Sequence, residues 1–379
     1  MGADIFISVA EDSADMHAAA LVSKASAALP DARFHGLTGR RLRAAGVETI
    51  FDMAAHAAML TGIIKVIGTA RKALQAVEAS WDRRRPDVVV LIDSPELHLR
   101  LAKKAKARGI PVLYYVAPQT WASRAGRNKQ IAHDIDHLAC ILPFEEAYFR
   151  EQGVTASFVG HPLFETLKQE RPDPQRLSDM QRGDAPLLAI LPGSRAHVID
   201  AVLPLQLKVL QHLHDNGVAF RATVSAASEE RARQIGGILQ GVDLPIDVAT
   251  EENATLLTAA DLVLVASGTA TLHVAHYRKP MVVLYDAGRV LQAAHRVLER
   301  FVLTTPHLSL INILAGSRIV PEYMPFGRDT EQIAGTVGRL LGDPDWQRQM
   351  VGEIDAVVAP LEASHASERV CGLLQELLG

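Results

Sequence analysis

A turn rich in small residues follows one buried apolar run in the second half of the chain. The apolar segment 187–191 precedes Pro192, Gly193, Ser194 and Arg195, and a periodic apolar run from 198 to 210 then predicts a helix. Backbone N–H groups and the dipole at such a helix start can hold a phosphate, and the Arg195 guanidinium suits phosphate oxygens. An ordinary turn with a solvated arginine fits the same stretch equally well.

A second turn of this kind lies downstream. The apolar segment 262–265 leads into Ser267, Gly268, Thr269 and Ala270 and then into an apolar helix start. Two small-residue turns between strand and helix in one half of the chain favour a nucleotide site, although they do not identify the nucleotide.

A carboxylate ends an apolar strand in the first half. The segment 86–93 reads Pro-Asp-Val-Val-Val-Leu-Ile-Asp and finishes at Asp93. In a parallel sheet the carboxyl ends of the strands face the ligand crevice, so Asp93 stands where a catalytic group is expected.

Other candidate motifs are weaker or missing. The chain has no Gly-x-Gly-x-x-Gly after a strand, no Gly-Lys-Ser/Thr loop and no His-Glu-x-x-His, which argues against common dehydrogenases, P-loop enzymes and zinc hydrolases. Asp134 and Asp136 form an Asp-x-Asp before a strand, where we expect a solvated loop at the wrong end of the sheet. Trp121 and Arg124 are either a sugar- or lipid-facing pair or part of a sealed loop.

Strands that alternate with helices surround these residues and predict an α/β fold with doubly wound parallel sheets. A polar, proline-bearing stretch at 168–185 predicts a boundary between an N-terminal domain (1–168) and a C-terminal domain (185–342), followed by a helical segment (343–379) that packs across both. The predicted strands are 4–9, 34–37, 86–93, 112–116, 138–142, 158–159, 187–191, 220–224, 245–248, 262–265 and 281–284.

Composition narrows the class of protein. The net charge of −4 gives no signal for nucleic acid, and two cysteines form no metal or disulfide pattern. No apolar run approaches the roughly 20 residues of a membrane span, and the N-terminus does not resemble a signal peptide, so we expect a cytoplasmic protein. The apolar stretch 57–77, which carries Lys65, Arg71 and Lys72, predicts either a core helix or a surface that touches a membrane.

With these segments in view, the chain resembles the lipid-A-disaccharide synthases of glycosyltransferase family 19. The resemblance runs from the first strand to about residue 322. The matching residues are Glu11-x-Ser13-x-Asp15, Asp93-x-Pro95, Pro118-x-x-Trp121-Ala122, Leu142 to Glu145, Gly160-His161-Pro162, Leu191 to Arg195, Ser267 to Leu272 and Asn312 to Gly316.

The resemblance implies a GT-B architecture of two Rossmann-like domains with the active site in the cleft between them. The family transfers 2,3-diacylglucosamine from its UDP carrier to the 6-hydroxyl of 2,3-diacylglucosamine 1-phosphate. The linkage formed is β-1,6, and UDP is released. The family requires no metal or other cofactor and acts peripherally at the cytoplasmic face of the inner membrane. The sequence does not determine the oligomeric state, and a homodimer is one option.

The resemblance also assigns roles. The general base falls on Asp93, and Glu11 is a second catalytic candidate near the acceptor. Substrate-binding positions fall on Ser13, Asp15, Trp121 and Arg124. The UDP-binding positions are Gly193, Ser194, Arg195, Ser267, Gly268, Thr269, Ala270, His273 and Asn312.

Some positions depart from the family pattern. Three glycines usual in the first loop are Ala10, Ala14 and Ala18, and His273 stands where the family carries a ribose-binding Glu. Three hypotheses therefore remain: an active lipid A disaccharide synthase, a diverged enzyme with another UDP-sugar or acceptor, and a non-catalytic lipid- or nucleotide-binding homologue. Retention of Asp93 and Arg195 argues against the last.

Overall fold

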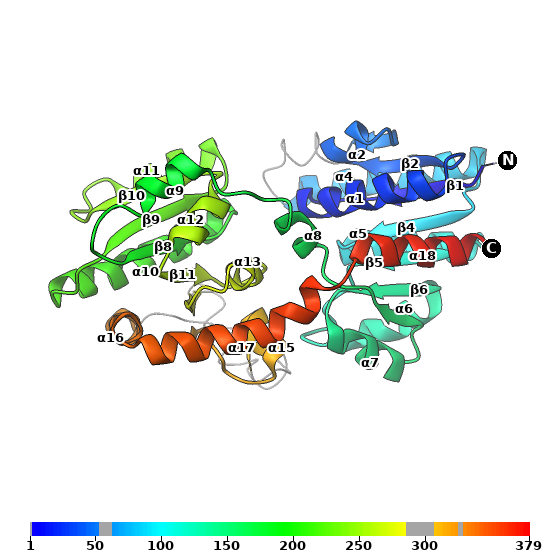
Figure 1. The fold of residues 1–379 in the computed structure, drawn as a ribbon. Helices are drawn as coiled ribbons and strands as arrows, with labels where there is room; N and C mark the ends of the chain where they lie inside the picture. Colours follow the sequence, from blue (N-terminus) through cyan, green and yellow to red (C-terminus); the bar gives the residue numbers. More distant parts are fainter. Residues whose placement is uncertain (1, 53–62, 286–306, 325–328) are drawn as a thin grey trace. The chain divides into compact units, whose positions relative to one another are not determined.

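The chain forms two compact α/β units (Figure 1). The computed structural model describes residues 2–52, 63–285, 307–324 and 329–379. Unit 1 comprises Met1–Glu165 and Glu362–Gly379, and unit 2 comprises Thr166–Leu361. The chain therefore changes unit just before the boundary region expected at 168–185. The expected C-terminal segment 343–379 consists of two helices, the first almost wholly in unit 2 and the second in unit 1.

Unit 1 contains a seven-stranded sheet in the order β3-β2-β1-β4-β5-β6-β7. All neighbouring strands run parallel. The central strands are continuous apolar runs because helices cover both faces of the sheet. The strands are β1 (Asp4–Ser8), β2 (Arg33–Thr38), β3 (Glu48–Asp52), β4 (Val88–Ile92), β5 (Val112–Tyr115), β6 (His137–Cys140) and β7 (Ala156–Phe158).

Two hydrophobic clusters hold the helices of unit 1 against this sheet. One cluster includes Val77 of α4, Leu101 of α5 and Phe149 of α7. The other includes Leu21 of α1 and Leu374 of α18, so the C-terminal helix packs into the core of unit 1. The helices are α1 (Asp12–Ala28), α2 (Arg40–Ala44), α4 (Ile63–Arg83), α5 (Pro95–Ala107), η1 (Ala125–Arg127), α6 (Asn128–Asp134), α7 (Pro143–Glu151), α8 (Leu163–Leu167) and α18 (Ala366–Leu378).

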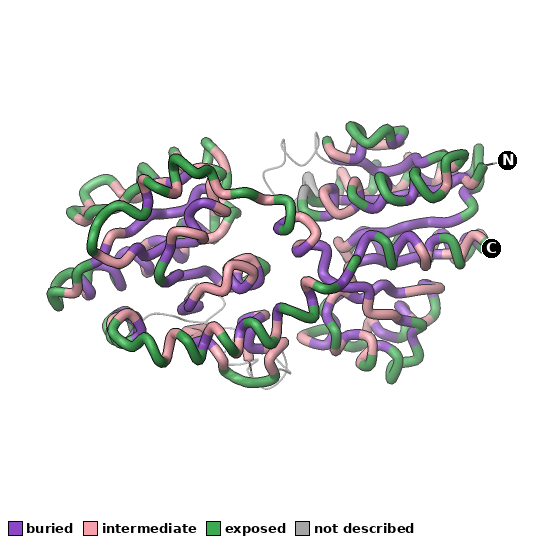
Figure 2. Tube along the Cα trace, viewed as in Figure 1, coloured by how far each residue is buried: buried purple, intermediate pink, exposed green. Residues whose placement is uncertain are grey.

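Unit 2 contains a six-stranded parallel sheet in the order β10-β9-β8-β11-β12-β13. Three of its inner strands, β8, β11 and β12, are buried along their whole length (Figure 2). The strands are β8 (Leu187–Leu191), β9 (Arg221–Ala226), β10 (Ile246–Thr250), β11 (Leu262–Ala266), β12 (Met281–Leu284) and β13 (Glu322–Tyr323). The helices are α9 (Pro174–Met180), α10 (Ala196–Asp215), α11 (Glu229–Leu239), α12 (Asn253–Ala259), α13 (Ala270–His276), α15 (Leu310–Ala315), α16 (Thr330–Gly342) and α17 (Pro344–Glu362).

Strand order reverses once in each sheet, and the predicted site residues follow the strands at these reversals. In unit 1 the reversal lies between β1 and β4, so the segments that begin at Val9 and Asp93 leave the sheet side by side. In unit 2 it lies between β8 and β11, which precede the two small-residue turns. Such reversals are where open α/β sheets bind ligands.

For residues 57–77 the sequence left open a core helix or a surface that touches a membrane, and the structure answers this for the later part of the stretch. Residues 53–62 lie outside the described residues. The later part of α4 carries Ala73, Val77 and Trp81, which are buried in the unit 1 core. This part of the stretch is therefore a core helix. No helix among the described residues is long and apolar enough to cross a membrane.

We expect unit 1 to lose stability in acid. Burial lowers the pKa of His98 to about 4 and that of His161 to about 3. A histidine in the unfolded chain titrates near 6.5, so the unfolded state takes up protons first as the pH falls. The contribution of these residues is complete above about pH 6.5 and is lost toward pH 4.

Urea unfolding followed by tryptophan fluorescence checks this expectation. The free energy of unfolding should drop between pH 6.5 and 4, and His161→Gln should reduce the slope. His133→Gln is the control, because the His133 side chain is 78% exposed. An equal slope in wild type and His161→Gln would contradict the assignment.

Candidate functional site

Strained backbone marks the carboxyl end of the unit 1 sheet. Asp93 and Ser94, which follow β4, have φ values of 56° and 47°, and Val116, which follows β5, has a φ of 66°. A non-glycine residue in this region costs about 1–3 kcal/mol, and for a β-branched valine it is rare. Strain of this kind is concentrated at functional sites, which agrees with the position expected for Asp93.

Glu11 lies at the neighbouring strand end. It is exposed and occupies the N-cap position of α1, with extended backbone at φ −129° and ψ 158°. α1 begins at Asp12, so Ser13 lies inside the helix. Ser13 is exposed. Glu11 and Asp93 therefore follow the two adjacent strands β1 and β4.

Asp15 has a structural role instead of the expected contact with substrate. Its side chain is buried and accepts hydrogen bonds from the backbone N–H groups of Gly39, Arg41 and Leu42 at 3.1, 2.7 and 3.1 Å. It thereby satisfies N–H groups at the start of α2, which have no partner within that helix. A Cβ on Gly39 would lie 2.4 Å from the Asp15 carboxylate, so the contact also requires the glycine.

Substitution tests this role of Asp15. We expect Asp15→Asn to lower the free energy of unfolding by about 1–3 kcal/mol, because an amide offers one acceptor oxygen in place of two. Urea unfolding measures the change, and Ser13→Ala in the same helix is the control. A fully stable Asp15→Asn protein with a raised KM for acceptor would restore the substrate-binding interpretation.

Trp121 seals a loop, which was the alternative to a sugar contact. Its Nε1 donates to Oε1 of Glu145 at 3.0 Å, and its ring packs edge-on against Phe144. Burial raises the pKa of Glu145 to about 7, although the bonds from Trp121 and from two backbone N–H groups oppose this shift. Arg124, by contrast, is exposed and pairs with Glu96 in the first turn of α5, three residues after Asp93.

Asp134 and Asp136 also serve the fold. The expectation of a solvated loop is wrong, since Asp134 is buried at the end of α6. Asp136 accepts from the backbone N–H of Val112 at 2.9 Å and from Lys106 at 2.8 Å. Val112 begins β5, so this carboxylate lies at the amino end of the sheet, as expected, away from Asp93.

The two predicted turns of unit 2 lie next to each other. Gly193 has a φ of +106°, and a Cβ there would meet Val198 at 2.9 Å and Ala266 at 3.9 Å. Gly268 in the second turn has a φ of +129°. Ser194 and Arg195 are exposed, and Arg195 is the N-cap of α10, a helix of 20 residues. An arginine at the start of a long helix gives positive potential suited to a phosphate group.

Gln206, which the sequence motifs did not point to, fixes α10 to the strands β8 and β11. It is fully buried, and its Nε2 donates to the carbonyls of Leu191 and Leu264 at 3.4 and 3.0 Å. Leu191 is the last residue of β8, so the bond ties the helix to the strand end that precedes the Gly193 turn. A lone glutamine in an apolar helix face was the available sequence signal.

His273 faces a carboxylate. Its Nε2 lies 3.3 Å from Oε2 of Glu170, and the Tyr277 hydroxyl donates to the same oxygen at 3.3 Å. Burial opposes ionisation of Glu170, but His273 and Tyr277 outweigh it and hold the pKa of Glu170 below its usual value. Where the family carries Glu, this chain therefore has a histidine beside a carboxylate from another segment.

A charge reversal tests this arrangement. We expect His273→Glu to destabilise unit 2 by about 1 kcal/mol, because it places two carboxylates together in a partly exposed site. Glu170→Gln combined with His273→Glu should recover most of the loss, and chemical unfolding of the four proteins in the cycle gives the coupling. A loss in the double variant equal to the sum of the two single losses would show that the two side chains do not interact.

Asn312 is buried within its own loop instead of facing a ligand. Its Oδ1 accepts from the backbone N–H groups of Ile319 and Val320 at 2.9 and 3.0 Å. Its Nδ2 donates to the carbonyl of Val320 and to Glu322, both at 3.0 Å. With both side-chain ends engaged and no exposed surface, the UDP-binding role expected for Asn312 does not fit this structure.

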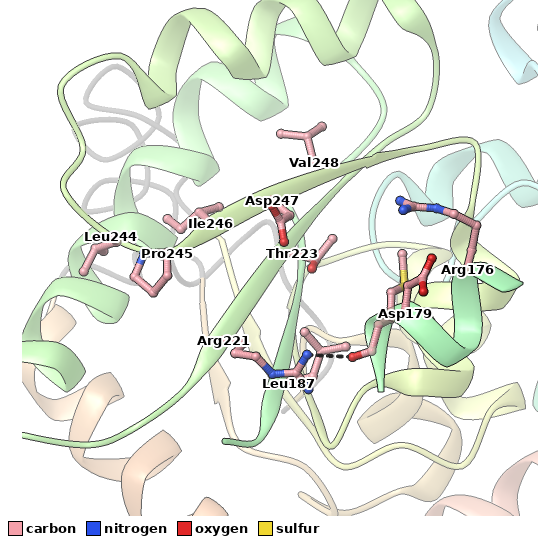
Figure 3. Close-up of a pocket in the computed structure, with 11 residues that line it drawn as sticks. Arg176, Asp179, Leu187, Arg221, Thr223, Leu244, Pro245, Ile246, Asp247 and Val248 are labelled. Atoms are coloured by element: carbon pink, nitrogen blue, oxygen red, sulfur yellow. Dashed lines mark hydrogen bonds between the residues drawn. The ribbon is translucent and has the colours of Figure 1, made fainter. Parts of the chain in front are cut away.

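A hollow of about 640 Å³ lies at the amino ends of the strands in the unit 2 sheet, opposite the Gly193 and Gly268 turns (Figure 3). Leu187, Arg221 and Ile246, which begin β8, β9 and β10, line it. Arg221 donates to the carbonyl of Met180 at 2.7 Å, so this arginine supports the fold. The hollow is thus separate from the turns at Gly193 and Gly268, which follow the carboxyl ends of the strands.

Comparison with solved structures identifies the class of fold. The S. aureus MnaA–UDP co-structure has a TM-score of 0.66 at 13% identity, over 100% of this chain and 97% of that chain. The calicheamicin glycosyltransferase CalG4 has a TM-score of 0.61 at 15% identity, over 100% and 98%. Sucrose-phosphate synthase from Thermosynechococcus elongatus scores 0.60 at 16% identity, over 100% and 98%. The chain has the GT-B fold of glycosyltransferases.

The sequence comparisons identify the family. The lipid-A-disaccharide synthetase family matches residues 5–367. The lipid-A-disaccharide synthase of Myxococcus xanthus is 35% identical over 99% of this chain and 97% of its own length. The synthase of Pseudomonas putida is 33% identical over 97% of both. The chain belongs to the lipid-A-disaccharide synthase family and is a glycosyltransferase of lipid A biosynthesis, as the sequence motifs predicted.

Proposed function

We propose that this glycosyltransferase transfers 2,3-diacylglucosamine from UDP-2,3-diacylglucosamine to the 6-hydroxyl of 2,3-diacylglucosamine 1-phosphate. The products are the β-1,6 disaccharide 1-phosphate and UDP. The observation that carries the proposal is the carboxylate of Asp93 on a strained turn at the strand-order reversal of unit 1, in a chain of this family.

Asp93 acts as the general base in this proposal. The acceptor hydroxyl attacks the anomeric carbon while its proton passes to the Asp93 carboxylate and the bond from that carbon to the UDP oxygen breaks. Such a single displacement inverts the anomeric configuration. General base catalysis of this kind contributes about 10²–10⁴-fold to a rate. Glu11 follows the adjacent strand and assists at the acceptor, with Ser13 exposed in the first turn of α1 and Arg124 paired to Glu96 nearby.

Unit 2 binds the donor nucleotide in this proposal. Arg195 and the N-terminus of α10 stabilise the charge that develops on the departing diphosphate. Gly193 and Gly268 keep the two turns compact beside it, with Ser194, Ser267, Thr269 and Ala270 on the same turns. We assign no UDP contact to Asn312, and we treat His273 as the partner of Glu170. We further propose that the protein works at the cytoplasmic face of the inner membrane, where acylated substrates reside.

Two of the three alanines that replace family glycines support an active enzyme over a diverged one. Ala14 and Ala18 lie inside α1 and are buried in the unit 1 core. Their methyl groups therefore fill space within the fold and do not obstruct the exposed start of the helix. The pair of His273 with Glu170 is the one observation that favours a changed donor, since it alters the charges beside the Gly268 turn.

A transfer assay tests the proposal. Purified protein, UDP-2,3-diacylglucosamine and labelled 2,3-diacylglucosamine 1-phosphate should give a labelled disaccharide on thin-layer chromatography. Asp93→Asn should lower kcat at least about 100-fold because it removes the base and keeps the shape of the side chain. The UDP affinity measured by calorimetry should stay within about twofold, because in this proposal the base acts only on the acceptor.

Asp82→Asn provides the matched control, since Asp82 is an exposed carboxylate on α4 that pairs with Arg108. Normal turnover by Asp93→Asn would refute the assignment of the base. UDP binding without any product from the wild-type protein would point to a different donor sugar or acceptor, and absence of UDP binding would favour the non-catalytic alternative.

A further inference from the structure

Two buried polar side chains bond to the turn that carries Asp93, and a third bonds to one of them. The backbone carbonyl of Asp93 accepts a hydrogen bond from Nδ1 of His98 at 2.6 Å and another from the Tyr114 hydroxyl at 2.6 Å. The Nε2 of His98 lies 2.8 Å from the Ser8 hydroxyl. Ser8 ends β1, Tyr114 lies on β5 and His98 lies on α5, so each comes from a different element around the β1–β4 reversal.

The direction of these bonds follows from their chemistry. A carbonyl oxygen only accepts, so both His98 and Tyr114 must donate to it, and the two bonds occupy both of its lone pairs. Burial lowers the pKa of His98 to about 4, so the ring is neutral with its proton on Nδ1. Nε2 then accepts from the Ser8 hydroxyl. Burial raises the pKa of Tyr114 well above its usual value, so this hydroxyl keeps its proton.

These bonds fix the peptide plane after Asp93, and a ladder bond fixes the plane before it. The Asp93 N–H donates to the carbonyl of Tyr115 at 2.9 Å, which extends the β4–β5 pairing by one residue. With both planes held, the φ and ψ angles of Asp93 are set, and with them the direction of its Cα–Cβ bond. The left-handed conformation of Asp93 and Ser94 persists only when the surroundings over-determine it.

We propose that Ser8, His98 and Tyr114 are positioning residues that hold the strained Asp93 turn so that its carboxylate meets the acceptor hydroxyl. This inference rests on the proposed role of Asp93 as the base. None of the three side chains needs to touch substrate. Their role is to hold a left-handed turn that a non-glycine residue does not favour. This matters for the rate because a small displacement of a catalytic group can lower the rate by a large factor.

Tyr114→Phe tests the inference with the smallest change. It removes one donor to the Asp93 carbonyl and keeps the buried ring. The matched control is Tyr115→Phe, one residue along the same strand. Tyr115 is equally buried, and its hydroxyl has no hydrogen-bond partner among the residues that the structure describes. We expect kcat to fall about tenfold in Tyr114→Phe and to change less than twofold in Tyr115→Phe, with the KM for donor and the UDP affinity unchanged in both.

Two substitutions of His98 separate its two hydrogen bonds. His98→Asn keeps a donor at the position of Nδ1 and loses the bond to Ser8, whereas His98→Gln places its amide at the position of Nε2 and loses the bond to the Asp93 carbonyl. We expect His98→Asn to retain several-fold more kcat than His98→Gln. A role in packing alone predicts at least as large a loss in His98→Asn as in His98→Gln, because asparagine leaves more of the buried space unfilled.

The outcomes separate this inference from the proposed function. Turnover in wild type that Asp93→Asn abolishes establishes the base, and a wild-type kcat in a folded Tyr114→Phe protein would then overturn the positioning role. Equal loss in the two tyrosine variants, or a loss in His98→Asn at least as large as in His98→Gln, would overturn it as well. If wild type and Asp93→Asn turned over alike, the proposed base itself would be wrong. If Tyr114→Phe did not fold, the His98 pair would still decide between positioning and packing.

Discussion

Parallel pairing of strands fixes the geometry on which the site depends. In each sheet, hydrogen bonds between neighbouring strands set a register that brings all carboxyl ends to one edge, and the reversal of strand order opens that edge at a single place. In unit 1, Glu11 and Asp93 lie at this reversal, and in unit 2 the Gly193 and Gly268 turns lie there. The central strands are buried on both faces, so their register cannot slip without exposing the core.

The structure shows what surrounds three of the residues that depart from the family pattern, Ala14, Ala18 and His273. Ala14 and Ala18 face the core of unit 1, where methyl groups add to packing. His273 lies beside Glu170, which comes from a segment about a hundred residues earlier in the chain. The first departure is an exchange of small buried residues, and the second changes the charges next to a turn. His273 therefore affects the choice of donor more than the alanines do.

The sequence predicted the parallel sheets, because buried strands are continuous apolar runs and the turns after them are rich in small and polar residues. It missed β3, whose residues are partly exposed, and β13, which has two residues. It also assigned ligand contacts to Asp15 and Asn312, which instead bind backbone N–H groups in their own surroundings. The partners of Asp15 lie more than twenty residues away in the chain, so no local pattern distinguishes a buried cap from an exposed ligand. The bond between His98 and Ser8 was missed for the same reason, because it joins residues ninety positions apart. The bond from His98 to the Asp93 carbonyl is local, but a histidine shortly after a candidate base does not reveal which of its atoms bonds to the turn.

The stereochemistry of the product tests the central claim most directly, namely that the chain forms a glycosidic bond by a single displacement at the anomeric carbon. Proton NMR of the product from purified protein, the UDP-activated acylated sugar and the acylated sugar phosphate would read the new linkage from its anomeric coupling. The account predicts a β-1,6 disaccharide with UDP released in equal amount. An α-linked disaccharide, or a donor that is hydrolysed or epimerised without disaccharide, would contradict it.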